Sequence, residues 1–385
     1  MTGGASFRHQ DYFAPRPLDL CQWERACANP SEDECRRRMA RAATRLRDAG
    51  VAAIYLIHGT FAGDDPLALA RDLERLSAPA ARFLRAVQKR TTDYLLEEVG
   101  NYTPDFARRL EELLNPPGSG PRLQVRRFFW SSENHHLGRM DGALRLVEEL
   151  ASGHERGRRV MLWGHSHAGN LLALFTNLLN ADEQQRQRVL HAARSFVRWP
   201  GIQVVDQPHW ERAMEKLRDE RSSLREMRFD LATFGTPIRY GWALNENVRL
   251  LHFVHHRPCP TLEPHCAKFP PSLRELWHAV YGDFIQQAGI AGTNLLLGWH
   301  RIGALIANWR LGELLQARYP SRFLWRYLRS GTRVADAGQS LLVDYPGPYG
   351  FPLSHFFGHA VYTQTPWMLF HLERSIDCFY PAETP

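Results

Sequence analysis

The sequence has no apolar run long enough to cross a lipid bilayer, which takes about 18 predominantly apolar residues. The most apolar stretch, residues 289–315, is interrupted by His300, Arg301 and Arg310. The first ten residues also lack the basic segment followed by an apolar core that a secretory signal peptide requires. We therefore expect a cytoplasmic protein, unless a secretion machine that does not read such a signal exports it.

Lysine is scarce, since only three of the 48 basic residues are lysine, at positions 89, 216 and 268. The arginines that dominate the net charge of +7 alternate with Asp and Glu, as in residues 71–75, and form no single basic block. Interleaved charges are typical of a solvated surface, and no nucleic-acid-binding signature is present. We expect no nucleic-acid partner, whereas the positive charge is compatible with contact to an anionic membrane surface. The oligomeric state stays open.

No CxxC pair occurs among the six cysteines, which favours reduced thiols over a disulfide framework. One segment does combine the side chains that bind zinc in other proteins, and it contains His255, His256, Cys259, His265 and Cys266. The spacing of these residues fits no zinc motif, and three prolines among them indicate a rigid loop. We therefore predict no metal site and no bound cofactor.

Six short segments are predicted to be strands, and they span residues 51–57, 123–130, 159–163, 229–234, 248–254 and 340–344. The first is a continuous apolar run, which is the pattern of a buried parallel strand. Helical stretches separate the six segments, and this alternation predicts an α/β fold with a mostly parallel sheet and helices on both faces. We expect residues 1–385 to form one domain. Two helical stretches, 67–115 and 181–227, are longer than a crossover needs and are candidates for a lid or cap.

The N-terminal region is expected to be irregular, because the first thirty residues are rich in proline and show no periodic pattern. Ser31, followed by Glu34, predicts a capping box, in which the serine and glutamate side chains bind the free amides at the start of a helix. That helix is expected to end near Gly50.

The sequence Gly164-His165-Ser166-His167-Ala168-Gly169 comes between the predicted strand 159–163 and the helical stretch 171–179. A strand that ends in G-x-S-x-(G/A) and turns directly into a helix is typical of a nucleophile elbow, whose strained turn exposes the serine hydroxyl. Small residues flank the serine because strand and helix pass close to each other there. The pattern predicts Ser166 as a catalytic nucleophile, and the alternative is a serine at an ordinary turn.

Residues 162–169 resemble the elbow of bacterial lipases and esterases of the α/β-hydrolase superfamily. Three more segments resemble lipase motifs in the order which that fold requires: the His-Gly loop after strand 3 (57–63), the Gly-Thr-Pro turn after strand 6 (234–237) and the catalytic-histidine segment (358–362). The resemblance extends from about residue 50 to the end of the sequence, although the long helical stretches and Ala168 depart from common lipases. It implies an α/β-hydrolase fold and a Ser-His-Asp triad.

The resemblance also implies an oxyanion hole, in which backbone N–H groups stabilise the negative charge of the reacting carbonyl by about 3 kcal/mol each. One donor is expected to be the amide of His167, the residue after the nucleophile. The second is expected to be Thr60, which follows the glycine of the His-Gly loop, with Phe61 as the neighbouring choice.

The base of such a triad lies in the loop after the last strand, where two histidines fit. We predict His359, because residues 358–363 match the lipase pattern and lead into the closing helix, and His355 is the alternative. His165 and His167 adjoin the serine, but an elbow points neighbouring side chains away from the hydroxyl, so both are expected to pack beside the site.

The acid is expected between the nucleophile and the base, after the strand 248–254, but no carboxylate follows that strand directly. We predict Asp283, because Gly282 beside it indicates a tightly turned loop, and Asp344 and Glu263 are the alternatives. Asp283 comes about thirty residues after Val254, so this prediction requires the proline-rich loop between them to fold back.

Together these motifs predict a serine hydrolase that cleaves carboxylic esters, with an ester or lipid as its substrate, through an acyl-enzyme intermediate. Thioesterase or phospholipase activity on the same triad is the alternative among enzymes. A catalytically silent hydrolase fold that only binds a ligand or partner is the alternative outside enzymes. The joint presence of the elbow, the His-Gly loop and the late histidine argues against a silent protein, because binding alone needs none of the three.

Overall fold

The structure is a computed structural model that describes residues 7–8, 16–59, 101–154, 157–193, 205, 207–290, 302–316, 327–347 and 355–381. Within these residues seven strands form one sheet, with the order β1-β7-β6-β5-β4-β2-β3 and every neighbouring pair parallel. The strands are β1 (Cys21–Arg25), β2 (Val51–Ile57), β3 (Gln124–Phe128), β4 (Arg159–His165), β5 (Arg228–Phe234), β6 (Val248–His255) and β7 (Gln339–Asp344). The predicted α/β protein with a parallel sheet is confirmed at this level.

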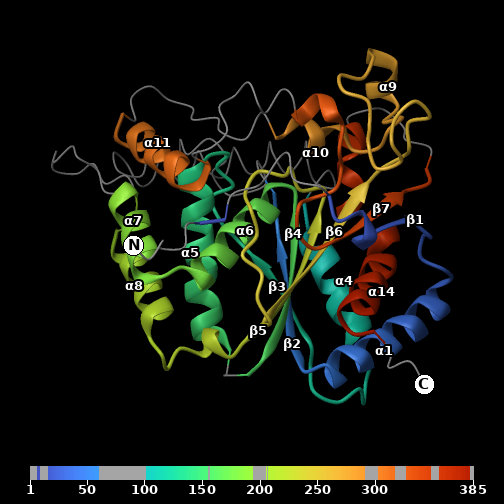
Figure 1. The fold of residues 1–385 in the computed structure, drawn as a ribbon. Coiled ribbons are helices and arrows are strands. Elements are labelled where there is room, and N and C mark those ends of the chain that lie inside the picture. Colours follow the sequence, from blue (N-terminus) through green and yellow to red (C-terminus); the bar gives the residue numbers. More distant parts are fainter. Residues whose placement is uncertain are drawn as a thin grey trace, which may run out of the picture.

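Helices cover both faces of the sheet (Figure 1). On one side lie α5 (His136–Gly153), α6 (His167–Asn180), α7 (Glu183–Ala193), α8 (Gln207–Arg218) and α11 (Ile302–Gln316). On the other side lie α1 (Glu32–Asp48), α4 (Pro104–Leu114) and α14 (Met368–Phe379). The short helices are α9 (Leu273–Trp277), α10 (Phe284–Ala288) and the 3₁₀ turns η1 (Leu18–Leu20), η2 (Ser223–Arg225), η3 (Phe356–Gly358), η4 (Ala360–Thr363) and η5 (Thr365–Trp367).

The central strand β4 shows why the buried strands appear in the sequence as uninterrupted apolar runs. Its side chains alternate between the two faces: Val160 and Leu162 belong to the hydrophobic core shared with α5 and α6. Met161 and Trp163 belong to the core shared with α1, α4 and α14. Because both faces are covered, the four residues 160–163 in the middle of the strand are all apolar, and the period of two is lost from this part of the sequence.

The direction in which the chain adds strands to the sheet reverses at one point. From β2 the chain passes outward to β3 at the edge, and then returns across β2 to β4 before continuing to β5, β6 and β7. Chain connections therefore leave β2 and β4 in opposite directions. In open parallel sheets, ligands bind beyond the carboxyl ends of the strands at this kind of reversal. A ligand-binding site is thus expected at the carboxyl ends of β2 and β4.

Two expectations for the N-terminal region were wrong. Residues 21–25 form β1, which pairs with β7 at the edge of the sheet, although they contain no apolar run because one side of an edge strand stays open. Ser31 does cap α1 by position, but its side chain makes no capping hydrogen bond. Glu34 pairs instead with Arg37, at 2.7 Å, so the predicted capping box does not form.

The two predicted insertions differ in how far the structure describes them. In the stretch 181–227, α8 packs on α5, and its Trp210 donates a hydrogen bond of 2.8 Å to Asp141. The stretch 67–115 ends in α4, while residues 67–100 lie outside the described residues. A lid or cap role stays a prediction for both. No helix in the part of the chain that the structure describes is long and apolar enough to span a membrane.

Candidate active site

Ser166 occupies the turn between β4 and α6, with φ 54° and ψ −128°. A residue other than glycine in this region is strained by roughly 1–3 kcal/mol, and such strain concentrates at functional sites. The turn is fixed from the neighbouring strand, because the Ser166 amide donates a 2.8 Å hydrogen bond to the carbonyl of Phe234 in β5. The sequence pattern and the backbone therefore agree on a strained strand-to-helix turn with serine at its apex.

Glycines make this sharp turn sterically feasible. A Cβ atom on Gly164 would lie 2.8 Å from Leu172 Cδ1, and one on Gly169 would lie 2.0 Å from Thr236 Oγ1. The Thr236 hydroxyl in turn donates to the Ser166 carbonyl at 2.9 Å. The Gly-Thr-Pro turn after β5 thus braces the serine, and Gly169 leaves the space that this contact needs.

The His-Gly segment at the end of β2 passes directly against the serine. A Cβ atom on Gly59 would lie 2.7 Å from Ser166 Cβ and 3.4 Å from Ser166 Oγ. Only glycine leaves room for so close an approach of the backbone. The predicted oxyanion donor Thr60 and its alternative Phe61 follow Gly59, but both lie outside the described residues.

His167, the other predicted oxyanion donor, is the first residue of α6. Amides in the first turn of a helix have no carbonyl partner within the helix, and the helix dipole makes this end positive. The imidazole of His167 is buried and accepts a 3.3 Å hydrogen bond on Nδ1 from the side-chain amide of Asn170. Burial lowers the pKa of His167 far below its ordinary value, so the ring is neutral. Its backbone amide is the part that suits an oxyanion.

The proline-rich loop after β6 does fold back, as the prediction of Asp283 requires. His256 and Gly282 form an antiparallel bridge, and the Asp283 amide donates a 2.9 Å hydrogen bond to the carbonyl of His255. The approach is close, because a Cβ atom on Gly282 would lie 2.3 Å from that carbonyl oxygen. Asp283 consequently stands at the carboxyl end of β6, although it is remote in sequence.

Asp283 and His359 form a buried pair, with Oδ2 and Nδ1 2.7 Å apart. The other carboxylate oxygen accepts a 2.8 Å hydrogen bond from the Gln286 amide at the start of α10. Burial alone would raise the pKa of Asp283, but the His359 charge and these hydrogen bonds outweigh it, so the pKa lies below the ordinary value. An ionised carboxylate can only accept, so Nδ1 of His359 donates a proton to this contact, and Nε2 is the ring nitrogen that remains to exchange a proton with another group.

The Nε2 atom of His359 is buried and has no hydrogen-bond partner, so it makes no hydrogen bond to Ser166. The ring nevertheless packs on His165, the residue before the serine, with 4.7 Å between ring centres. Catalytic hydrogen bonds are often long without substrate and tighten in the complex. His165 packs beside the site, as the sequence led us to expect.

The alternative residues have other partners. His355 caps a turn by accepting the Gly358 amide at 3.1 Å on Nδ1. Asp344 accepts a 2.6 Å hydrogen bond from Arg257 Nε, and Glu263 is exposed. The structure brings only Asp283, of the three candidate acids, into contact with His359. The assignment of Asp283 as the acid stays a prediction that this contact supports.

Two residues around the acid were missed from the sequence. Tyr362 donates a 3.0 Å hydrogen bond to Asp283 Oδ2, and the spacing His359-x-x-Tyr362 was the available signal. Arg333 donates to the Asp283 carbonyl and, at 2.8 Å, to Gln286 Oε1. Burial lowers the pKa of Arg333. No local pattern marks this arginine, because its partners come from a segment about fifty residues away.

The His/Cys segment 255–266 makes separate contacts. His255 Nδ1 donates to the Gly358 carbonyl at 2.8 Å, and His256 Nε2 donates to the Pro264 carbonyl at 2.7 Å. Burial lowers the pKa of His255 to about 4 and that of His256 to about 3. Within the described ranges, no three His, Cys, Asp or Glu side chains are arranged to hold a metal ion.

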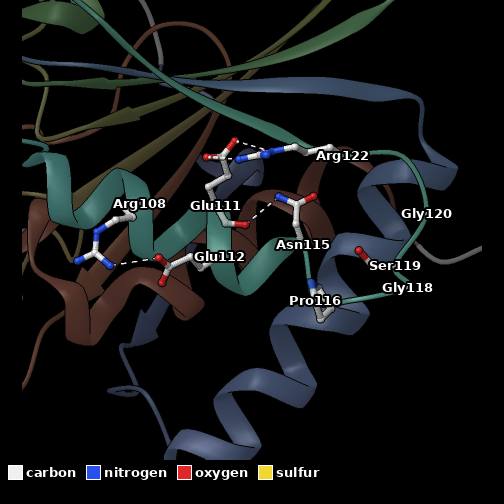
Figure 2. A pocket seen from close by; sticks show the side chains of 9 residues that line it. All are labelled: Arg108, Glu111, Glu112, Asn115, Pro116, Gly118, Ser119, Gly120 and Arg122. Atoms are coloured by element: carbon white, nitrogen blue, oxygen red, sulfur yellow. Dashed lines mark hydrogen bonds and ion pairs between the residues drawn. The ribbon is translucent and has the colours of Figure 1, made fainter.

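A surface hollow lies away from Ser166, where α4 leads into the edge strand β3 (Figure 2). Its lining consists of Arg108, Glu111, Glu112, Asn115, Pro116, Gly118, Ser119, Gly120 and Arg122. The two arginines are paired with glutamates: Arg108 with Glu112 and Arg122 with Glu111, each at 3.1 Å. The two arginines of the hollow therefore have no unpaired charge to bind a ligand. None of the lining residues belongs to the Ser166 site.

No protein-family model, no curated protein and no solved structure matches this chain. A function for it must accordingly come from the chemistry of its own residues. The strained Ser166, the glycine that passes over it and the buried Asp283–His359 pair all lie at the carboxyl edge of the sheet. These are the residues on which a proposal can be built.

Proposed function

We propose that the protein is a serine hydrolase of the α/β-hydrolase type that cleaves carboxylic esters, with lipid esters as the expected class. Ser166 is the nucleophile, His359 the base and Asp283 the acid. The observation that carries this proposal is the orientation of His359. Its Nδ1 is fixed by a buried carboxylate while its Nε2 stays buried and unbonded, and the ring packs on His165, the neighbour of the strained Ser166.

The arrangement along the chain supports the same proposal. The residues follow one another in the order Ser166, Asp283, His359, which is the order of the α/β-hydrolase triad. The serine and Gly59 lie at the reversal of strand order between β2 and β4, where ligands bind in open parallel sheets. A serine at an ordinary turn would need neither this position nor an oriented imidazole.

In the proposed reaction, Ser166 Oγ attacks the ester carbonyl carbon while its proton passes to His359 Nε2. Asp283 stabilises the resulting imidazolium through Nδ1–H. The tetrahedral intermediate then collapses: the C–O bond to the alcohol breaks, and His359 returns the proton to the leaving oxygen. Water attacks the acyl-enzyme with the same proton transfers, which releases the carboxylic acid and restores Ser166.

The negative oxygen of each tetrahedral intermediate requires fixed N–H donors. We assign one of them to the amide of His167 at the positive end of α6, and the second to Thr60 after Gly59. The close approach of Gly59 to Ser166 supports this assignment, because it brings the His-Gly segment within reach of the serine hydroxyl.

The test is a panel of esters, thioesters and phospholipids of graded acyl length, assayed with purified protein and with Ser166→Ala. We expect an ester to be hydrolysed fastest, and the variant to lose about 10⁴-fold or more of kcat. A thioester or phospholipid as the best substrate would revise the substrate class and leave the triad in place. Undiminished hydrolysis by a folded Ser166→Ala protein would refute the proposal.

A further inference from the structure

The acid Asp283 is bound on a single oxygen by two residues of one short segment. Its Oδ2 accepts from His359 Nδ1 at 2.7 Å and from Tyr362 Oη at 3.0 Å. The two donors are three residues apart, His359 as the N-cap of the 3₁₀ turn η4 and Tyr362 within it, and residues at this spacing share one side of a 3₁₀ turn. Any movement of the base is therefore accompanied by movement of a second donor to the same oxygen.

The direction of the Tyr362 proton is determined by its other neighbour. The backbone N–H of His255 donates to Tyr362 Oη at 2.7 Å. A backbone amide cannot accept, so the hydroxyl uses a lone pair toward His255 and must direct its own proton to Asp283. The hydroxyl is thus a fixed donor to the carboxylate and not a freely rotating group.

Gly235 leaves the space that lets the tyrosine reach the acid. A Cβ atom at this position, where φ is +59°, would lie 2.4 Å from Tyr362 Cε2 and 2.7 Å from Asp283 Oδ2. A side chain there would intrude between the two groups. Tyr362 is also fully buried, and burial followed by the Asp283 charge raises its pKa well above the ordinary value, so the hydroxyl keeps its proton.

We propose that Tyr362 is a positioning residue of the catalytic acid, which holds Asp283 Oδ2 aimed at His359 and shares its negative charge. This inference rests on the proposed function. The other charged or titratable groups that face the carboxylate are Arg333, which donates to the Asp283 backbone carbonyl, and His255 at the end of β6. Among the described residues, Oδ2 accepts its hydrogen bonds from His359 and Tyr362, so the tyrosine is the donor that can tune the oxygen which the base contacts.

Tyr345 offers a matched control from the same aromatic cluster. It is equally buried, its ring lies 5.8 Å from that of Tyr362, and its hydroxyl bonds His371 Nε2 at 2.7 Å. Tyr362→Phe removes a hydroxyl with two buried hydrogen bonds, and Tyr345→Phe removes one with its buried hydrogen bond to His371, each at nearly constant volume. Both variants should lose thermal stability, Tyr362→Phe somewhat more. Only Tyr362→Phe should also lower the rate of ester hydrolysis.

For Tyr362→Phe we expect kcat on the best soluble ester to fall about tenfold, with KM within about twofold of the wild-type value. The acidic limb of the kcat/KM profile should move up by about half a pH unit. The cause is the lost donor, since a more negative Oδ2 favours the protonated imidazole. Tyr345→Phe should keep both the rate and the profile. Unchanged kcat and profile in a folded Tyr362→Phe protein would overturn the proposal.

A second readout needs no substrate. The proton shared by His359 Nδ1 and Asp283 should give a low-field ¹H NMR resonance that disappears in Asp283→Asn. We expect this resonance to shift in Tyr362→Phe and to stay in place in Tyr345→Phe. The proposal is wrong if the resonance is unaltered in Tyr362→Phe, or if the wild-type protein shows none. Failure of the proposed function would show separately, as absence of any turnover by a wild-type protein that has the resonance.

Discussion

Two fully buried aspartates lie at opposite ends of the parallel strands. Their hydrogen-bond partners are similar, but only one of the two aspartates is placed to take part in catalysis. Asp230, near the amino end of β5, accepts hydrogen bonds of 3.1 Å on both oxygens from Arg159 and one of 2.5 Å from Tyr380. Asp283, at the carboxyl edge, accepts from His359 and Tyr362. Each carboxylate therefore has one basic partner and one tyrosine.

The difference lies in what the basic partner can do. Arginine stays protonated at any physiological pH and has no lone pair to offer, so the Asp230–Arg159 pair can only hold β4 and β5 together. Histidine presents a second nitrogen, and His359 Nε2 is left without a partner beside the serine. A buried carboxylate thus indicates catalysis only when its partner can pass a proton onward. We expect mutations at the two sites to affect different measurements.

The largest effect is expected from Asp283→Asn, because the imidazolium formed during attack loses its counter-charge and the imidazole loses its orientation. We expect kcat to fall by up to about 10⁴ with the fold retained. The measurement is kcat, with a thermal melt of the same protein. Asp344→Asn is the matched control, and should act mainly on stability through its contact with Arg257. The acid assignment would be reversed by an active Asp283→Asn beside a folded, inactive Asp344→Asn.

Gly59→Ala should remove much of the activity without removing any chemical group of the triad. The added methyl would stand 2.7 Å from Ser166 Cβ and 3.2 Å from the His165 carbonyl, so the loop or the serine must shift. We expect a loss of about 10²-fold in kcat/KM. Gly153→Ala is the control, because its methyl would meet the movable end of the Arg126 side chain at 3.2 Å and the Tyr55 hydroxyl at an ordinary 3.7 Å. Equal activity of the two variants would show that the His-Gly segment does not shape the site.

Asp230→Asn should affect stability and leave catalysis intact. The change replaces one of the two oxygens that accept from Arg159 and Tyr380 by an NH₂ group, and the lost buried hydrogen bonds cost about 1–3 kcal/mol of unfolding free energy. The kcat of the folded protein should stay within about twofold of the wild-type value, because the two sites share no partner. Urea unfolding and kcat on the same preparation give both values. If Asp230→Asn had unchanged stability but a low kcat, the claim that Asp230 serves stability and Asp283 serves catalysis would be wrong.

The smallest effect is expected in the pH dependence of stability, where the two aspartates should have opposite slopes. The folded-state pKa of Asp283 is lowered, so its stabilisation is present above the ordinary value of 3.8 and is lost as pH falls below it. Burial, the largest influence, raises the pKa of Asp230, so the folded state gains stability as pH falls through that raised value. The stability deficit of Asp283→Asn should therefore grow between about pH 3 and pH 5, and that of Asp230→Asn should shrink.

Unfolding free energies at steps of half a pH unit would resolve these slopes, which reach at most about 1.4 kcal/mol per pH unit. Parallel slopes for the two variants would mean that the two carboxylates have the same electrostatic environment in the folded protein.

The sequence predicted those parts of the fold that are determined by residues adjacent in the chain. The apolar run 51–57 became β2 with the same bounds, because a strand buried on both faces needs apolar residues at every position. The elbow was equally visible, since the strand, the serine and the helix are contiguous. In contrast β1 was missed, because an edge strand with one open side carries no such run.

The residues around Asp283 could not be predicted from local sequence patterns. Asp283 could be named from chain order, but its place at the end of β6 depends on the His256–Gly282 bridge, which no short motif encodes. The contacts of Tyr362 and Arg333 with the acid span 79 and 50 residues of sequence. The true capping box likewise formed at Ser272 and Glu275, not at Ser31, because the local fold and not the motif decides which serine caps.

The most direct measurement is active-site labelling with a fluorophosphonate, followed by mass spectrometry of the labelled peptide. A serine activated by a histidine base displaces fluoride from the probe's phosphorus and keeps the phosphonyl group as a stable adduct. We predict one adduct, on Ser166, formed slowly in Asp283→Asn and absent from Ser166→Ala. An unlabelled wild-type protein, or an adduct that persists in a folded Ser166→Ala protein, would contradict the assignment of Ser166 as the nucleophile.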